Sequence, residues 1–337
     1  MDKSKHIVLA HGGGGQLTDE LIANTLLPRL GNETLGQLLD SSIVPGTAER
    51  MAMTIDSYVV RPLFFPGGDI GRLAVCGTVN DLAVCGAEPL GLALSLIMAE
   101  GLEREVLESA MNSVREAADE AGVKVITGDT KVVGRGQADG MYITTAGVGS
   151  VREGLRLHPD QIRAGDKLII SGTIADHGLA VMLAREMPEV QSVLRSDVAP
   201  LKRMIGRLLD KVSGVVFMRD PTRGGLACVA ADIAGRTGLH VVLDEGRIPI
   251  RAETRHAADM LGLEVLEVAN EGKVVVVVRP EAAEAALGAL REDEHGRDAR
   301  IIGQVEDTRD GLCELQTVLG GRRIMLKPYG EQLSRIC

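Results

Sequence analysis

The sequence predicts an α/β (α+β) chain with two lobes and a short tail. Strand-like and helix-like periods alternate in both halves of the chain. A polar stretch that contains a proline, residues 152–166, separates the halves and is typical of a domain joint. The length of 337 residues agrees with about two domains. We therefore expect one domain over residues 1–152, a second over residues 153–327, and a tail over residues 328–337.

The first half carries alternating short periods and one long helical pattern. The apolar residues of segment 103–121 keep one face of a helix, and Gly122 supplies a stop signal. A short buried strand, residues 123–127, is expected to end in Gly128-Asp129, and residues 141–151 form another strand. The remaining alternating periods cover residues 6–10, 19–30, 51–55, 71–85 and 92–98.

The second half repeats this style of alternation. A helix is expected to begin at Pro280, because proline favours the first turn of a helix, and to run to about Arg291. No internal repeat or low-complexity segment interrupts the pattern. The other expected strands are residues 167–171, 215–218, 273–279, 299–305, 312–319 and 322–326, and the other expected helices are residues 177–185, 201–212 and 225–236.

The composition argues against nucleic acid as a partner. The formal net charge is −10, and no run of lysine or arginine could follow a phosphate backbone. Only three tyrosines, three phenylalanines and no tryptophan are available for base stacking. An anionic ligand must therefore be held by local groups.

No targeting or membrane segment is expected. The apolar tetrad at residues 7–10 is too short for a signal peptide, and the apolar stretch at residues 90–99 is too short to span a bilayer and is typical of a buried strand. We therefore expect a cytoplasmic protein without membrane contact. Five cysteines without a Cys-x-x-Cys pair argue against a disulfide framework and a structural zinc site. Four of them lie in apolar runs and are expected in the core: Cys76, Cys85, Cys228 and Cys313.

The glycine run at His11-Gly12-Gly13-Gly14-Gly15-Gln16 could surround a phosphate. It follows a strand-like segment and precedes a helix-like segment, where free amide groups are available. A flexible turn is the alternative. The sequence contains neither a Walker loop nor the spaced glycines of dinucleotide-binding folds, so the common nucleotide folds are disfavoured.

Four aspartates at polar or glycine-rich turns could hold magnesium with a nucleotide. Mg²⁺ combines a few carboxylates with waters and substrate phosphates, so ligands from several loops suit it. An aspartate at a turn can equally cap backbone amides. The four candidates are Asp56, Asp81, Asp129 and Asp220.

Three further positions could take part in phosphate chemistry. The segment Arg219-Asp220-Pro221-Thr222-Arg223-Gly224-Gly225 combines a carboxylate, a hydroxyl, a guanidinium and flexible amides at a helix start, although Thr222 could be an ordinary helix cap. Lys131 could neutralise a transferring phosphate or hold a bound carbonyl oxygen in place. The alternative is a solvated lysine. Glu271 precedes a strand and marks either a site or a plain turn. His177 is interpreted as structural, and no nucleophile elbow of a hydrolase is present.

The last residue, Cys337, could carry a chemical group on a swinging arm. The residues after Lys327 would span roughly 30 Å if extended. The alternative is a terminal cysteine by chance on a disordered end. A prenylation signal would place three residues after the cysteine, so it is excluded. The α-carboxylate should disfavour the thiolate and Arg335 should partly offset this, so we expect modest intrinsic reactivity.

Together these segments resemble the ATP-binding superfamily of aminoimidazole ribonucleotide synthetase, selenophosphate synthetase and thiamine-monophosphate kinase. Within it they are most similar to the HypE family of hydrogenase maturation factors. The resemblance runs from end to end, and Ser334 replaces a proline that is usual in the family, which affects the expected stiffness of the tail. The matching motifs are the glycine run, Thr54-Ile55-Asp56-Ser57-Tyr58-Val59, Pro62 to Gly68, Thr127 to Val133, Arg219 to Gly225, Asn270-Glu271-Gly272-Lys273 and Arg335-Ile336-Cys337.

The resemblance implies a carbamoyl dehydratase with an aminoimidazole ribonucleotide synthetase-like fold. The carbamoyltransferase HypF would load Cys337 as a thiocarboxamide, and Mg²⁺ and ATP would drive its dehydration to a thiocyanate. The cyanide would then pass to the iron of a [NiFe]-hydrogenase precursor on the HypC-HypD complex. A homodimer with nucleotide sites near its interface, and a tail that moves between an inward and an outward pose, are also implied.

The resemblance also implies roles for individual residues. Glu271 would accept an amide proton, and Lys131 would stabilise charge on the amide oxygen or the transferring phosphoryl group. The four aspartates named above would hold magnesium. The residues implied in nucleotide binding are Gly13, Gly14, Asp56, Asp81, Asp129, Thr130, Thr222, Arg223, Gly224 and Gly225.

Two other interpretations remain. A selenophosphate synthetase would keep the ATP site but needs a reactive cysteine or selenocysteine near the amino-terminal glycines, and the first cysteine here is Cys76. A non-catalytic carrier would use only the tail, and the aspartate and glycine-rich segments would then have no purpose.

Overall fold

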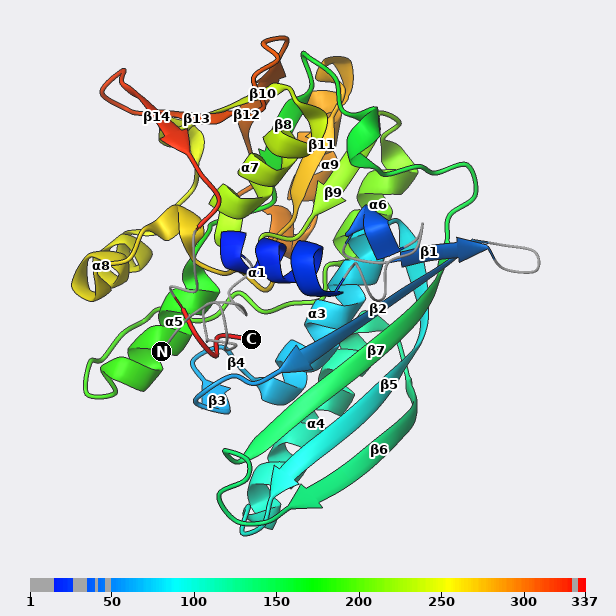
Figure 1. Cartoon of the computed structure of the whole chain (residues 1–337), viewed down its shortest axis with the longest axis vertical. Coiled ribbons are helices and arrows are strands. Elements are labelled where there is room, and N and C mark those ends of the chain that lie inside the picture. Colours follow the sequence, from blue (N-terminus) through cyan, green and yellow to red (C-terminus); the bar gives the residue numbers. More distant parts are fainter. Residues whose placement is uncertain (1–14, 27–34, 40–41, 46–49, 329–332) are drawn as a thin grey trace.

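The computed structural model describes residues 15–26, 35–39, 42–45, 50–328 and 333–337. Two lobes, each built on its own sheet, make up these residues (Figure 1). The strands of one sheet fall within residues 42–151 and those of the other within residues 167–325. No helix among these residues is long and apolar enough to cross a membrane.

The first lobe contains a five-stranded sheet with helices on one face. The strand order is β1-β2-β7-β5-β6, with β5 and β6 parallel and the other neighbours antiparallel. Helices α3 and α4 pack together, and α3 lies against the sheet (Figure 1). The elements are β1 Ser42–Pro45, β2 Arg50–Tyr58, α3 Ile70–Val84, β5 Ala87–Ala99, α4 Arg104–Ala121, β6 Val125–Val133 and β7 Met141–Val151.

Both helices of this lobe have clear local signals. The Asp69 carboxylate caps α3 by accepting hydrogen bonds from the amides of Gly71 and Arg72. Helix α4 ends at Gly122, whose left-handed backbone (φ 63°) suits glycine. The predicted helix over residues 103–121 and its stop are therefore confirmed.

The opposite face of the five-stranded sheet carries exposed apolar side chains. Strand β6 forms the outer edge of the sheet, and all of its residues except the last are exposed. No helix of the described residues covers this face in Figure 1. The exposed apolar residues of β2, β5 and β6 include Met53, Ile55, Leu90, Ile126 and Val132.

The second lobe contains a seven-stranded sheet with helices on both faces. Its order is β14-β13-β10-β12-β8-β11-β9. The four valines of β11 are all completely buried: Val275 and Val277 pack in the same cluster as α7, and Val276 and Val278 pack with α6 and α9. The elements are β8 Lys167–Ile170, α6 Lys202–Lys211, β9 Val215–Arg219, α7 Gly225–Thr237, β10 His240–Asp244, β11 Val275–Val278, α9 Ala283–Arg291, β12 Arg300–Glu306, β13 Cys313–Gln316 and β14 Arg322–Met325.

Several smaller elements surround the junction of the lobes. Helix α5 contacts α8 and the hairpin of β3 and β4, and a connecting segment, residues 194–201, runs between α5 and α6. The Asn80 side chain of α3 binds this segment: it accepts from the Leu201 amide (2.7 Å) and donates to the Ala199 carbonyl (3.0 Å). These elements are α1 Gln16–Leu21, η2 Ile22–Leu26, β3 Phe64–Phe65, β4 Gly68–Asp69, α5 Asp176–Glu186 and α8 Ala252–Leu261.

The prediction of a buried strand ending in Gly128-Asp129 was wrong. Strand β6 continues to Val133 and is exposed, because it lies at a sheet edge with a neighbour on one side only. Strand β10 and helix α8 were not predicted. The expected strand at residues 6–10 lies outside the described residues.

Candidate active site

A cavity of about 660 Å³ lies where the two lobes and the tail meet. This volume is in the range of cavities that hold small-molecule ligands. Its wall includes residues of strand β2, of helix α3 and of the segment before α7. Glu271, which precedes β11, and the last residue of the chain also line it. The charged or reactive residues that line it include Asp56, Asp81, Asp220, Arg223, Glu271 and Cys337.

The end of the tail is docked beside the end of β2. The amide of Val59 donates to the main-chain oxygen of Cys337 (3.1 Å), and the amide of Arg61 donates to the carbonyl of Arg335 (3.2 Å). Ile336 is only 3% exposed and belongs to the apolar core of the first lobe. The backbone and the side chains together hold the terminal thiol at the cavity wall.

The Cys337 thiol is neutral in this position. Burial raises its pKa to about 12, and the nearby carboxylates of Glu271 and Asp56 act in the same direction. Arg223, through its charge and a hydrogen bond, partly opposes them. The sequence predicted modest reactivity from the α-carboxylate and Arg335, but Arg335 instead binds the Val59 carbonyl (3.0 Å) and Asp139 (2.5 Å). The direction of the pKa shift is the expected one, and its largest cause is burial.

Glu271 is a buried carboxyl group with unused hydrogen-bonding capacity. It is 4% exposed, and among the described residues its Oε1 is the buried side-chain oxygen without a partner. Burial raises its pKa well above the ordinary value, and the charges of Asp220, Asp197 and Asp56 raise it further. Such a group can take a proton at near-neutral pH.

The backbone around Glu271 is fixed by two residues that are distant in sequence and close in space. Its amide donates to Asp197 (3.1 Å), and its carbonyl accepts from Asn80 (3.3 Å). The adjacent Asn270 accepts from the Ala175 amide (2.7 Å) and donates to the Pro221 carbonyl (2.8 Å). The buried Asn270 thereby joins the start of α5 to the segment before α7, which explains why an asparagine precedes Glu271.

Three of the four predicted magnesium ligands line the cavity. The Thr54 hydroxyl donates to Asp81 (2.7 Å), and Arg223 lies 3.9 Å from Asp56. Asp220 is 6% exposed. Within the described part of the chain, no three acidic, histidine or cysteine side chains form a ready cluster for a metal ion. A Mg²⁺ ion would therefore need nucleotide oxygens and water to complete its coordination.

The turn before α7 explains its two glycines. Gly224 and Gly225 have φ values of +76° and +59°, and a Cβ on Gly225 would lie 2.6 Å from the carbonyl oxygens of Leu266 and Val268. Helix α7 has Gly224 as its N-cap, without a side-chain cap, so the alternative role of Thr222 as an ordinary cap is wrong. Thr222 and Arg223 line the cavity instead.

Asp129, Thr130 and Lys131 do not line the cavity in the single chain. All three lie on the exposed edge strand β6, where Lys131 Nζ lies 2.9 Å from Asp129 Oδ1. Their predicted contact with the other site residues would therefore require groups from outside this chain or a movement of the strand. Strand β6 extends past Asp129 instead of ending there, so these three residues lie along an edge strand and not in a turn at the cavity.

The predicted phosphate contacts of Gly13 and Gly14 lie outside the described residues. The next residues are tied to the start of the tail. The Gln16 amide donates to the Pro328 carbonyl (2.9 Å), and Lys327 pairs with Asp19 (2.7 Å) and Asp232 (3.5 Å). The segment that follows the glycine run therefore adjoins the same cavity, which Asp19 and Lys327 also line.

Sequence reasoning missed one group at the cavity and one group that contacts the tail. Tyr58 lines the cavity two residues after Asp56, and the period of two in a strand could have placed it on the same face. His177 was interpreted as structural, yet its Nε2 lies 3.1 Å from the carbonyl of Ile336. No sequence signal pairs His177 with the tail, since 159 positions separate them.

Two family models together match most of the chain. The AIR synthase related protein N-terminal domain matches residues 39–151, and the corresponding C-terminal domain matches residues 163–313. The carbamoyl dehydratase HypE of Bradyrhizobium diazoefficiens is 47% identical, covering 98% of this chain and 95% of that protein. The carbamoyl dehydratase HypE of Escherichia coli K12 is 41% identical, covering 98% of this chain and 99% of that protein.

Solved structures give the same result. A chain in the crystal structure of a HypE-HypF complex superposes with a TM-score of 0.87, with 42% identity, covering 91% of this chain and 99% of that chain. The hydrogenase maturation protein HypE in complex with ATP superposes with a TM-score of 0.83, with 41% identity, covering 98% and 100%. AaThiL in complex with AMPPCP and TMP, at 17% identity and a TM-score of 0.69, shares the fold.

Proposed function

The chain belongs to the HypE family of AIR synthase related proteins, and we propose that it is a carbamoyl dehydratase acting on its own terminal cysteine. It uses ATP to convert a thiocarboxamide on Cys337 into a thiocyanate, which supplies the cyanide ligand for [NiFe]-hydrogenase maturation. The observation that carries the proposal is the position of Cys337 in the same cavity as the buried Glu271.

The chemistry requires the amide oxygen to become a leaving group. The oxygen attacks the γ-phosphorus of ATP, ADP leaves, and one amide proton is lost. The resulting O-phosphoryl imidate then loses its second N–H proton and phosphate, and the C–N triple bond forms. No oxidation or reduction takes place, and the oxygen of the amide leaves in the phosphate.

Glu271 is the base for an amide proton. Its Oε1 has no hydrogen-bond partner among the described residues, so it can accept from an N–H group on the adjacent Cys337. Its raised pKa makes the carboxylate a stronger base than an exposed glutamate. Arg223, which contacts the Cys337 sulfur and faces Asp56, would stand between the reacting group and the phosphates.

The remaining cavity residues fit a nucleotide and its metal ion. Thr222, Gly224 and Gly225 would offer a hydroxyl and turn amides to phosphate, as would the glycine run with Gly13 and Gly14. Asp56, Asp81 and Asp220 would hold Mg²⁺ together with phosphate oxygens and water. The ion supplies charge neutralisation for the transferring phosphoryl group.

The partners follow from the reaction. HypF is the expected donor of the carbamoyl group, supported by the solved HypE-HypF complex of a relative. A HypC-HypD iron scaffold is the expected acceptor of cyanide, and a cytoplasmic location stays a prediction. Docking at HypF requires the thiol to leave the cavity, so the tail must move between an inward and an outward pose.

A homodimer would complete the site. The uncovered apolar face of the five-stranded sheet and the exposed edge of β6 are typical of an interface surface. A second copy packed on this face could bring its Asp129, Thr130 and Lys131 to the cavity, where Lys131 would stabilise negative charge. Sedimentation measures this directly: Ile126→Glu should turn a dimer into a monomer, while Val193→Glu, at an exposed valine outside this face, should not.

Intact mass tests the proposed reaction. With HypF, carbamoyl phosphate and ATP, the chain should gain a carbamoyl group on Cys337 and then lose one water. A carbamoyl adduct that does not respond to ATP would favour the non-catalytic carrier. A phosphorylated selenium product formed from selenide, with Cys337 unmodified, would favour a selenophosphate synthetase.

A further inference from the structure

Side chains of helix α5 hold the tail by contacting backbone carbonyl oxygens of the tail. His177 Nε2 lies 3.1 Å from the carbonyl oxygen of Ile336, the residue before the reactive cysteine. Arg185, about two turns further along α5, donates to the carbonyl oxygen of Ser334 (2.7 Å). Both contacts involve backbone atoms of the tail, so they fix its path and do not depend on its side chains.

The hydrogen-bond network around His177 fixes its tautomer. A carbonyl oxygen only accepts, so Nε2 carries the hydrogen and donates to Ile336. Nδ1 then accepts from the Ser196 hydroxyl (2.8 Å), whose oxygen accepts from the Val198 amide (3.1 Å). Burial lowers the pKa of His177, which favours this neutral form. The two hydrogen bonds therefore hold the ring with its Nε2–H group directed at the Ile336 carbonyl.

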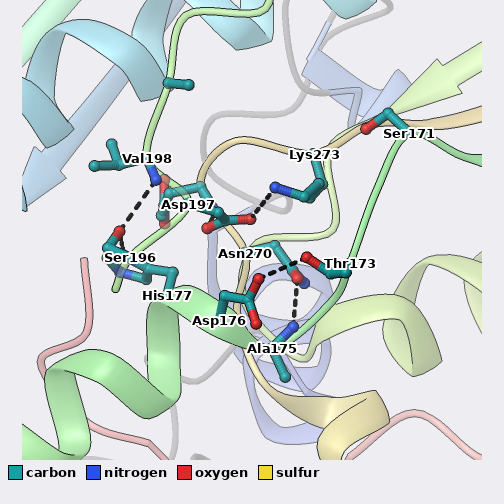
Figure 2. Close-up of polar contacts among 12 residues, drawn as sticks. Ser171, Thr173, Ala175, Asp176, His177, Ser196, Asp197, Val198, Asn270 and Lys273 are labelled. Atoms are coloured by element: carbon teal, nitrogen blue, oxygen red, sulfur yellow. Dashed lines mark hydrogen bonds and ion pairs between the residues drawn. The ribbon is translucent and has the colours of Figure 1, made fainter. Parts of the chain in front are cut away.

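Asp197, the residue next to Ser196, supports Glu271 and also pairs with Lys273, a pair that Figure 2 shows. Asp197 accepts from the Glu271 amide (3.1 Å) and pairs with Lys273 (2.9 Å), and both charged side chains are nearly buried. The packing is tight, because a Cβ on Gly272 would lie 1.8 Å from the Asp197 carbonyl oxygen. Two adjacent residues of the connecting segment thus contact the histidine that holds the tail and the backbone of the base.

We propose that His177 is a positioning residue that seats the Cys337 sulfur against Glu271. Ser196 and Asp197 are adjacent, and together they fix the position of the tail relative to the base. This inference rests on the proposed function, because that position brings the amide on Cys337 to its base. His177 acts through the Ile336 carbonyl and touches neither the reacting group nor the nucleotide.

Loss of the His177 contact should release the tail without disturbing the nucleotide site. One neutral hydrogen bond changes such an equilibrium by roughly three- to tenfold. A thiol reagent reacts mainly with the released form, because the docked Cys337 is only partly exposed and its thiol has a pKa raised to about 12. The alkylation rate of Cys337 therefore reports the released fraction of the tail.

The experiment measures alkylation of Cys337 by iodoacetamide in the full-length chain alone, by peptide mass. His177→Phe should raise the rate about three- to tenfold, and His177→Gln, whose amide can still donate to Ile336, should restore most of the protection. His256→Phe, at an exposed histidine of α8, should leave the rate unchanged. Cys76, which is completely buried, reports whether each variant is folded.

An unchanged Cys337 rate in His177→Phe, with Cys76 still protected, would overturn the proposal, as would an equal rate in the Phe and Gln variants. If His177→Phe exposes Cys76, Ser196→Ala takes its place, since it removes the partner of Nδ1; it should accelerate alkylation, and an unchanged rate would also overturn the proposal.

A second readout separates this inference from the proposed function. In single turnovers of preloaded thiocarboxamide, His177→Phe should lower the rate of thiocyanate formation, because the amide on Cys337 is no longer held against Glu271, without changing the ATP concentration that gives the half-maximal rate. An unchanged rate of dehydration would count against the positioning role. If the unaltered chain forms no thiocyanate at all, the proposed function fails, while the alkylation result still decides whether His177 holds the tail.

Discussion

Glu271 combines burial, neighbouring negative charge and an oxygen that has no partner in the described part of the chain. Burial disfavours its ionised form, and the charge of Asp220 adds to this effect. Since a free buried oxygen costs stability, its position is better explained by a role with substrate than by packing. Glu271 is therefore the residue on which the chemistry can be tested most simply.

The rate of dehydration should depend on the ionisation of Glu271. The base must be a carboxylate, so the single-turnover rate should fall as pH falls through its raised pKa, with a midpoint well above 4.5. The measurement is thiocyanate formation from preloaded protein over a range of pH. A rate that stays flat down to pH 4.5 in folded protein would contradict the assignment.

Replacement of Glu271 should also stabilise the fold. A carboxyl group whose folded pKa is raised loses folding stability as pH rises from its unfolded pKa toward its folded pKa. Glu271→Gln should therefore raise the melting temperature at pH 7 and stall the thiocarboxamide. Glu281→Gln, at an exposed glutamate, is the control and should leave both quantities unchanged. A lower melting temperature for Glu271→Gln would show that the ionised group is stabilised by contacts.

Part of the candidate site could be predicted from single residues. Asp56, Asp220, Arg223 and Glu271 lie at strand ends or before a helix, and such positions tend to converge at a domain junction. The role of His177 could not be predicted, because it depends on where a tail 159 positions away docks. Sequence pattern carries little information on such long-range contacts.

Among the elements, the turn before α7 depends on glycine at Gly225. Gly225→Ala should destabilise the fold by about 1 kcal/mol or more, because its φ is +59° and two carbonyl oxygens lie 2.6 Å from the added Cβ. Gly235→Ala, within the same helix and with open space around it, should stabilise the fold by about 0.5–1 kcal/mol. Urea unfolding measures both, and equal effects would contradict this account of the turn.

The elements with strong local signals were predicted well. Helix α4 has a continuous apolar face and a glycine stop, and β11 is a run of four valines. Residues 123–127 were predicted as a buried strand because most of them are apolar, whereas the exposure of β6 depends on its place at the sheet edge. Strand order is a tertiary property, so composition alone could not give it.

At the scale of the whole molecule, the position of Lys131 predicts shared active sites. Homodimers of the Lys131→Ala chain, and homodimers of the Glu271→Gln chain, should dehydrate the thiocarboxamide on Cys337 inefficiently. Mixed dimers of the two variants should recover about a quarter of the normal rate at random assortment, because one of the two sites in each mixed dimer is then intact. If the mixture stays inactive while dimers form, Lys131 and Glu271 would have to act from the same chain.

The central claim is that ATP activates the amide oxygen on Cys337. The direct measurement is a single turnover of chain that carries a carbamoyl group labelled with ¹⁸O at its carbonyl oxygen, followed by mass analysis of the phosphate released. We predict one ¹⁸O atom in phosphate for each thiocyanate formed on Cys337. Thiocyanate formed with unlabelled phosphate would contradict the account.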